Sequence, residues 1–302
     1  MIGCVIALLS APSNLGLRPP EPGATPGAAK APEALREAGL FTRFIDEGAI
    51  DDGVVLPRRY RDDAEPGRLR NQDAIIEHSR RLADRICEVI SGEHRPLVIG
   101  GDCSILTGVG LGLKRLGRFG LLHVDGHTDF RHPGNSAECA SLAGEDLAAA
   151  IGLHWPEVAD VDSLGPLFLP QDATHLGCRE DDEHLAEVRS HMRATTVDEL
   201  RGEGITAAAT RIRDGVVSAE LDGYWLHIDV DVLDPTHLPA VDSPAPGGLA
   251  PEELVELLRV LAPSACGADV TVFDPDLDPS GRYACRLAEI VHAGLADLGT
   301  RI

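Results

Sequence analysis

The chain of 302 residues has little positive charge and no long apolar run. Lysine and arginine number 27 against 49 aspartates and glutamates, so the formal net charge is −22 at pH 7. This charge argues against nucleic acid or an anionic membrane surface as a partner, because their phosphates repel it. No stretch approaches the roughly 20 apolar residues that cross a bilayer. The composition fits a soluble protein that acts on a small molecule, and it is compatible with a cationic substrate.

The sequence favours neither a secretory signal at residues 1–10 nor the paired cysteines of a disulfide or zinc framework. Residues 1–10 are apolar but carry no basic residue, so we expect a first strand there instead of a signal peptide. The cysteines are odd in number, scattered and without a Cys-x-x-Cys pair, which indicates reduced thiols in a cytoplasmic protein. They are Cys4, Cys87, Cys103, Cys139, Cys178, Cys266 and Cys285.

Short apolar runs alternate with helical patterns along the chain. Strands are expected at residues 5–9, 97–99, 119–124, 174–178, 195–197, 224–228 and 270–273. Helices are expected at residues 32–38, 72–91 with Asn71 as N-cap, 140–151, 182–193, 251–261 and 287–298. This alternation predicts a parallel sheet covered on both faces. No linker or repeat divides the chain, so we expect a single domain over residues 1–302.

Two acidic motifs follow two of these strands, Asp-Gly-His-Thr-Asp at residues 125–129 and Asp-Val-Asp at residues 229–231. Side chains two apart in an extended segment point to the same side, so Asp125, His127 and Asp129 can converge. Asp229 and Asp231 can converge in the same way. Both motifs lie at the carboxyl ends of strands, where ligands bind in parallel sheets. Crowded carboxylates repel one another unless a cation lies between them, so the motifs predict a divalent metal site.

Together with Gly-Gly-Asp-Cys-Ser at residues 100–104, these motifs resemble the ureohydrolase family of arginase, agmatinase and formiminoglutamase. That family carries Gly-Gly-Asp-His-Ser, Asp-Ala-His-x-Asp and Ser-x-Asp-x-Asp in the same order. Residues 31–40, 177–182 and 247–253 also look like family segments, so the resemblance covers nearly the whole chain. It implies a three-layer α/β/α fold with a central, mostly parallel sheet of about eight strands.

The resemblance also implies a binuclear manganese site. Asp125 and Asp229 would bridge the two ions. Cys103 and Asp129 would complete the first metal site, and His127 and Asp231 the second. Carboxylates and imidazole suit Mn²⁺, and two ions about 4 Å apart can share a hydroxide of lowered pKa. The implied reaction is hydrolysis of a C–N bond in a linear amidine, which is a guanidino, hydroxyguanidino or formimino compound.

Cys103 departs from the family, because most members place a metal-ligating histidine there. A thiolate is a softer ligand and would shift the metal preference toward Zn²⁺, Fe²⁺ or Ni²⁺. The alternative is an inert packed thiol and a weak or absent first metal. Cys103, Gly126 and His227 together resemble the branch that hydrolyses N-hydroxy-L-arginine in D-cycloserine synthesis. That branch lacks the loop histidine that transfers protons elsewhere in the family, and Ala143 stands at its place here.

Two further departures concern the substrate. Val272 aligns with the family's guanidinium-binding glutamate, and an apolar side chain cannot pair with a cation. Asp274 could take over this role, or it belongs to a solvated acidic turn. Arg131 replaces an asparagine that helps to hold the α-carboxylate in arginase, and it either binds a carboxylate or balances the acidic site. We predict substrate contacts from Arg131, Asp274 and Asp182, the last from the family-like segment at residues 177–182.

The remaining histidines near the motifs receive separate predictions. His132 is predicted to be a catalytic proton shuttle beside Asp125. His123 and His227 are expected to point away from the ligands, as buried histidines or as donors to a carboxylate. Glu253 is expected to act as a helix-dipole acid.

Two other functions stay open beside amidine hydrolysis. One is a metal-binding protein of this fold without catalysis, and the other is an amide hydrolase of the deacetylase type. The partner is expected to be a small-molecule substrate, with neither nucleic acid nor membrane. Whether the chain forms a homo-oligomer stays open.

Overall fold

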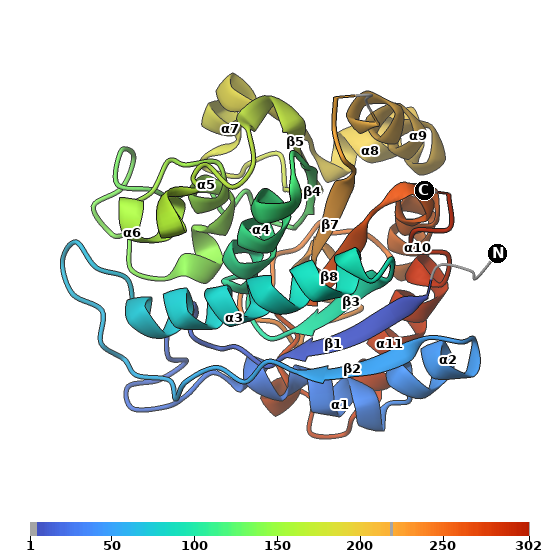
Figure 1. The fold of residues 1–302 in the computed structure, drawn as a ribbon, viewed down its shortest axis with the longest axis horizontal. Coiled ribbons are helices and arrows are strands. Elements are labelled where there is room, and N and C mark those ends of the chain that lie inside the picture. Colours follow the sequence, from blue (N-terminus) through green and yellow to red (C-terminus); the bar gives the residue numbers. More distant parts are fainter. Residues whose placement is uncertain (1–4, 218–219, 302) are drawn as a thin grey trace.

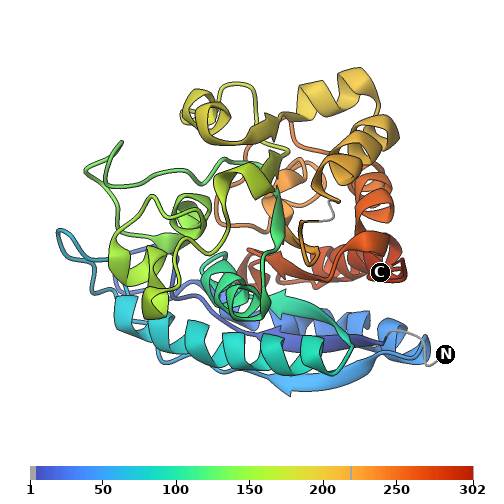
Figure 2. The ribbon, with the colours of Figure 1, turned by 45° about the horizontal axis from the view of Figure 1, so that its top comes forward.

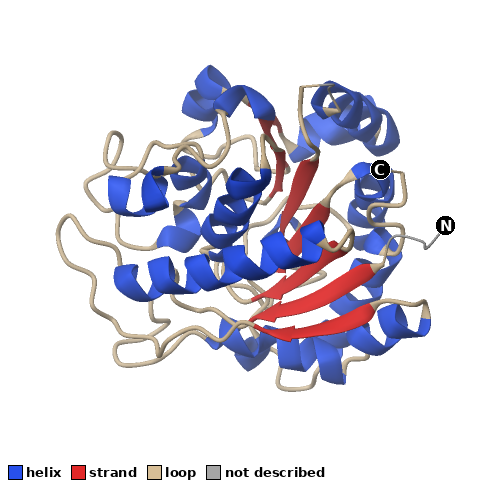
Figure 3. Cartoon of the chain, viewed as in Figure 1, coloured by secondary structure: helices blue, strands red, loops and turns tan. Residues whose placement is uncertain are grey.

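A single parallel sheet of eight strands forms the centre of the computed structural model, which describes residues 5–217 and 220–301. The strand order is β2-β1-β3-β8-β7-β4-β5-β6, and every pair of neighbouring strands is parallel. The strands are β1 Ile6–Ala11, β2 Ile50–Val54, β3 Arg95–Gly100, β4 Gly120–Val124, β5 Ala173–Leu176, β6 Arg193–Thr195, β7 Tyr224–Asp229 and β8 Gly267–Thr271. Because all strands run the same way, their carboxyl ends meet at one edge of the sheet (Figure 3).

Helices cover both faces of this sheet. They are α1 Ala31–Glu37, α2 Leu40–Asp46, α3 Gln72–Ser91, α4 Ile105–Leu116, α5 Asp146–Ala150, α6 Pro156–Ala159, α7 Leu185–His191, α8 Val197–Glu203, α9 Ile205–Val216, α10 Pro251–Leu261 and α11 Arg282–Leu295. Figures 1 and 2 show α3 and α4 on one face and α1, α10 and α11 on the other. The predicted three-layer fold is confirmed.

The core is divided by the two-residue period of the strands. Leu8 and Leu226 pack with the layer of α10 and α11, whereas their neighbours Leu9 and Trp225 pack with the layer of α3 and α4. Both sets are fully buried, as expected for parallel strands that are covered on both sides. No helix among the described residues is long and apolar enough to cross a membrane.

Several predicted elements have different bounds. The helix expected at residues 140–151 is broken into a 3-10 turn at Leu142–Gly144 and the short helix α5. The strand expected at residues 195–197 ends at Thr195, and Val197 begins α8. The strand β2 and the helices α2, α4, α6, α8 and α9 were not predicted.

The Asn71 position also differs from the prediction. Asn71 precedes α3 but has a left-handed backbone, with φ at 56°, and its side chain does not cap the helix. Its Oδ1 instead accepts from the Arg61 backbone and its Nδ2 donates to the Leu15 carbonyl. The side chain therefore ties loops together in place of capping. Of the seven cysteines, the six in the described residues are unpaired thiols, and Cys4 lies outside those residues.

Candidate metal centre

The two acidic motifs meet because their strands are neighbours in the sheet. β4 pairs with β7 so that Val124 lies beside Ile228, which places Asp125 next to Asp229. Oxygens of Asp125, Asp229 and Asp231 all lie within 4.8 Å of one another. A second group with the same spacing consists of Asp125, His127 and Asp129. The structure thus brings the five motif side chains into two groups that share Asp125.

Backbone amides hold these carboxylates in place. The His127 amide donates to Asp125 at 2.7 Å, and the Asp231 amide donates to Asp229 at 2.8 Å. The Gly126 amide donates to Asp231 at 3.1 Å. A Cβ at Gly126 would come within 2.2 Å of the Arg179 guanidinium and 2.6 Å of the Asp231 carbonyl. This tight packing explains why glycine stands here in place of the family's alanine.

The negative charge of the crowded carboxylates favours binding of a cation at this site. Burial raises the pKa of Asp125 well above its usual range, and the neighbouring carboxylates Asp129 and Asp229 raise it further. Asp125 Oδ2 is also buried without a hydrogen-bond partner among the described residues. A divalent ion would satisfy this oxygen and relieve the repulsion, so these side chains fit the metal that the motifs predict.

His127 and Asp231 form an ion pair within the site. Their Nδ1 and Oδ2 atoms lie 2.9 Å apart. Burial alone would lower the pKa of His127, but the hydrogen bond with Asp231 and the charges of Asp231 and Asp129 together raise this pKa to about 9. Burial would raise the pKa of Asp231, but the hydrogen bond and charge of His127 together with the charge of Arg179 lower this pKa. Without metal, a proton on His127 therefore takes the place of a cation at this carboxylate.

Cys103 lies against the same carboxylates. It is fully buried in the turn between β3 and α4, and its Sγ is 2.9 Å from Asp229 Oδ2 and 3.1 Å from Thr271 Oγ1. Burial raises the pKa of this thiol well above its ordinary value, and the Asp229 carboxylate raises it further. Without metal, Cys103 is therefore a neutral thiol that donates to Asp229.

A cavity of about 470 Å³ opens above the acidic residues. Ala143 and Val272, two of the positions that depart from the family pattern, both line it. Val272 has φ at 72°, a left-handed conformation that is strained for a β-branched residue. Its amide donates to the Gly101 carbonyl at 2.7 Å, which holds this conformation beside the Cys103 turn.

The three predicted substrate contacts have different positions. Arg131 lines the cavity, and its guanidinium is 3.6 Å from the exposed carboxylate of Glu183. Asp182 also lines the cavity but accepts from the Thr128 amide at 2.9 Å and the Thr128 hydroxyl at 2.6 Å, so it fixes the first acidic motif. Asp274 is not among the lining residues. It accepts from the Gly27 amide at 3.1 Å and caps the turn Pro275–Leu277.

His132 does not line the cavity in which it was predicted to transfer protons. Its Nδ1 accepts from the Gly134 amide at 3.0 Å, and its Nε2 lies 3.1 Å from Glu187. Both ring nitrogens are therefore engaged, and the buried His132 side chain does not line the cavity. His184, which the sequence reasoning missed, does line it. The signal was its place two residues after Asp182.

The prediction that His123 and His227 point away from the ligands is wrong. His123 Nε2 lies 3.8 Å from Asp125 Oδ2, and His227 lies within 4.8 Å of a ligand atom of Cys103. Each histidine precedes a motif aspartate by two residues, and side chains two apart in a strand share a side. The alternation that places the aspartates on one side of the strand therefore places both histidines there as well.

The fold and the site together define a class of three-layer α/β proteins with a cluster of candidate metal ligands at the carboxyl edge of the sheet. The model of the arginase family matches residues 6–295, and the chain belongs to this family. It is 27% identical over 297 residues to an arginase of Bacillus subtilis (strain 168), with 95% of this chain and 96% of that protein covered. An arginase of Brevibacillus brevis is 28% identical over 265 residues, which cover 83% and 86% of the two chains.

Solved structures show the same relationship. The native arginase of Bacillus caldovelox superposes with a TM-score of 0.86 and 26% identity, covering 98% of each chain. The proclavaminate amidino hydrolase of Streptomyces clavuligerus superposes with a TM-score of 0.72 over 99% of this chain and 93% of that one. At 23% identity, the second likeness shows the shared fold alone.

Proposed function

We propose that this chain is a metal-dependent hydrolase that cleaves a C–N bond of a linear amidine. The observation that carries the proposal is the convergence of the family's acidic motifs below an open cavity, with Asp125 shared by both ligand groups. Asp125, Asp229 and the other motif side chains would hold the metal, with Mn²⁺ as the family's metal and Zn²⁺, Fe²⁺ or Ni²⁺ as alternatives because of Cys103. When bound, such ions supply Lewis acidity and lower the pKa of a water molecule.

The protein's own side chains would position the substrate. Asp182 fixes the Thr128 backbone, and therefore the loop that carries His127 and Asp129. Arg131 stands on the cavity wall with a guanidinium that can bind a substrate carboxylate at two points. These contacts would hold an amino-acid-like substrate with its amidine end toward Asp125.

The cavity wall favours a weakly basic amidine over a guanidinium. Val272 offers no charge to a cation, and Asp274 is engaged outside the cavity. Ala143 cannot transfer a proton. A hydroxyguanidine suits such a wall, because its hydroxyl group lowers the basicity of the nitrogens. The proposed substrate class is therefore N-hydroxyguanidino compounds that carry a carboxylate.

A substrate screen tests this proposal. The metal-free protein is loaded with Mn²⁺ or Zn²⁺ and incubated with arginine, N-hydroxyarginine, agmatine, guanidinobutyrate or formiminoglutamate, and release of the amine product is measured. We expect turnover of N-hydroxyarginine above that of arginine, and none by the Asp125→Asn variant. Stoichiometric metal with no turnover of any amidine would contradict the proposal.

A non-catalytic role is a second candidate, and one observation favours it. His132 is bound to Glu187 outside the cavity lining and Ala143 has no titratable group, so neither residue can transfer a proton to a substrate in the cavity. A metal-binding sensor or scaffold would need no such group. The same screen separates this candidate from the hydrolase.

A further inference from the structure

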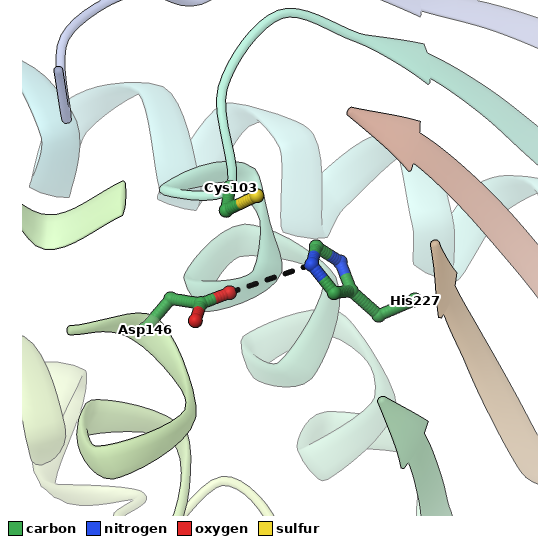
Figure 4. A group of neighbouring side chains, drawn as sticks. All are labelled: Cys103, Asp146 and His227. Atoms are coloured by element: carbon green, nitrogen blue, oxygen red, sulfur yellow. Dashed lines mark ion pairs between the residues drawn. The ribbon is translucent and has the colours of Figure 1, made fainter. Parts of the chain in front are cut away.

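Behind the acidic motifs lies a second cluster of side chains that could bind a metal ion, formed by Cys103, Asp146 and His227 (Figure 4). Each offers one ligand atom, and the three atoms lie within 4.8 Å of one another. Cys103 comes from the turn after β3, Asp146 begins α5, and His227 lies within β7. All three are at most 1% exposed. The family resemblance assigns no metal contact to Asp146 or His227.

Three polar atoms of this cluster lack hydrogen bonds among the described residues, and their nearest polar neighbours lie at ion-pair distances of 3.4–3.5 Å. Both carboxylate oxygens of Asp146 and the Nε2 atom of His227 are buried without a hydrogen bond within the described residues. Buried polar groups are nearly always paired, so three unpaired atoms that face one another indicate a missing ligand. Asp146 Oδ1 also lies 3.4 Å from Nε2 of His123, which is likewise unpaired.

The spacing of these atoms is that of metal ligands. His227 Nε2 lies 3.5 Å from Asp146 Oδ2, the contact drawn as a dashed line in Figure 4. A hydrogen bond between such atoms is shorter, at about 2.7–3.2 Å. Two ligands at neighbouring corners of a tetrahedral zinc site, each about 2.0–2.1 Å from the ion, are about 3.3–3.4 Å apart.

A third carboxylate orients His227 for this role. Asp269 on β8 lies 2.6 Å from His227 Nδ1 and also accepts from the Trp225 indole, so its position is fixed from two sides. Histidine ligands of metal ions usually donate their second ring nitrogen to a carboxylate in this way, which leaves the other nitrogen free to bind the ion. Here the free nitrogen is Nε2, and it faces Asp146.

We propose that Cys103, Asp146 and His227 bind one divalent ion of borderline softness, with Zn²⁺ preferred. A thiolate, an imidazole and a carboxylate are all established zinc ligands, and the thiolate disfavours Mn²⁺. The proton of the Cys103 thiol leaves to solvent as the sulfur binds the ion. The outer group of Asp125, His127 and Asp231 keeps the oxygen-rich set that suits Mn²⁺. The inference holds whether or not the protein hydrolyses an amidine.

Cobalt spectroscopy of the full chain tests this site. Co²⁺ replaces Zn²⁺ and gives a near-ultraviolet charge-transfer band only when a thiolate binds it. We expect the metal-free protein to develop this band with one equivalent of Co²⁺ and Cys103→Ser to show none. Asp146→Asn and His227→Gln should weaken the affinity of the thiolate-bound ion at least about tenfold. Cys266→Ser and His78→Gln change a buried thiol and a buried histidine elsewhere, and both should keep the band.

X-ray absorption of the zinc-loaded wild-type protein gives a readout that does not depend on whether a variant folds. We expect one sulfur at about 2.3 Å and at least one imidazole nitrogen at about 2.0–2.1 Å from the zinc. Zinc with oxygen and nitrogen ligands only would overturn the inference. So would an Asp146→Asn variant that folds and keeps wild-type affinity, because His227 would then be an imidazolium held between Asp146 and Asp269.

Discussion

The two ligand groups of this site differ in how their polar atoms are satisfied. In the outer group, the Asp125 and Asp229 carboxylates accept backbone amides, and His127 pairs with Asp231. In the inner group, Asp146 and the Nε2 atom of His227 have no such partners among the described residues. A proton on His127 can therefore take the place of a cation in part of the outer group, where Asp125 Oδ2 also stays unpaired among the described residues. In the inner group, three buried atoms lack a hydrogen bond among the described residues. The comparison predicts two ions with different chemistry.

The largest effect is expected for a substitution of Asp125, which belongs to both groups of motif ligands. Asp125→Asn keeps the size of the side chain but removes its charge, so it should remove the ion of the outer group, leave the ion beside Cys103 and lower any activity by at least about 100-fold. Metal analysis after dialysis measures the first effect and amine release the second. A variant that retained two full equivalents of metal would show that Asp125 does not hold the outer ion.

The next largest effect is expected at Cys103, and it should distinguish the inner ligand group from the outer one. Cys103→Ala should remove one equivalent of metal and leave the other, because the sulfur contacts the inner group and Asp229 alone of the outer carboxylates. Equilibrium dialysis with Zn²⁺ and Mn²⁺ measures both. Cys266→Ala, which also removes a buried thiol, serves as the control and should retain both equivalents. Loss of both metals in Cys103→Ala, but not in the control, would mean that the groups form one site.

The substrate contact at Arg131 should have a smaller effect that depends on the substrate. A two-point contact with a carboxylate contributes about 1.5–3 kcal/mol, so Arg131→Ala should raise KM at least about tenfold with little change in kcat. The effect should appear with a substrate that carries the α-carboxylate and vanish with one that lacks it. Equal losses for both substrates would instead indicate that Arg131 only balances the acidic site.

The stability of the metal-free protein should fall as the pH rises. The His127 pKa is raised from 6.5 to about 9, so its contribution is fully present below pH 6.5 and is lost as the pH passes through about 9. The raised pKa of Asp125 acts in the same direction from a lower pH. Because His127 is partly exposed, we expect its share to be only about 1–2 kcal/mol.

Thermal unfolding between pH 5 and pH 10 measures this dependence. His127→Asn should unfold with a shallower slope between about pH 6.5 and pH 9. Saturating metal should reverse the trend, because the ion replaces the proton. A metal-free protein that became more stable over this range would contradict the assignment of charges.

The smallest effect is expected at His132. Since both of its ring nitrogens are engaged with Gly134 and Glu187, His132→Asn should change kcat by less than about threefold. A loss of about 100-fold or more, together with a lost limb in the pH profile, would restore the proton shuttle that the sequence predicted.

The outer group was predictable from the sequence for a physical reason. Its side chains belong to two short motifs, and strand alternation alone places Asp125, His127 and Asp129 on one side. The pairing of β4 with β7 then joins the motifs, as the family resemblance implied. The same alternation places His227 on the side of Asp229, because the two residues are two apart in the strand.

Asp146 could not have been found in this way. Its position depends on the break between Leu142–Gly144 and α5, where a continuous helix was expected. Val272 is similar, because no local pattern predicts a positive φ for a β-branched residue. Both features result from tertiary packing around the carboxyl edge, and both lie where the chain departs from the arginase pattern.

Anomalous diffraction from crystals loaded with Mn²⁺ and Zn²⁺ tests the central claim, that two unlike ligand groups bind two unlike ions. Data collected at the absorption edge of each metal identify the ion at each position. We predict a manganese peak among Asp125, His127 and Asp231, and a zinc peak within about 2.3 Å of Cys103 Sγ and beside His227 Nε2. Peaks of either metal confined to the carboxylates of the outer group, with none beside Cys103 and His227, would contradict it.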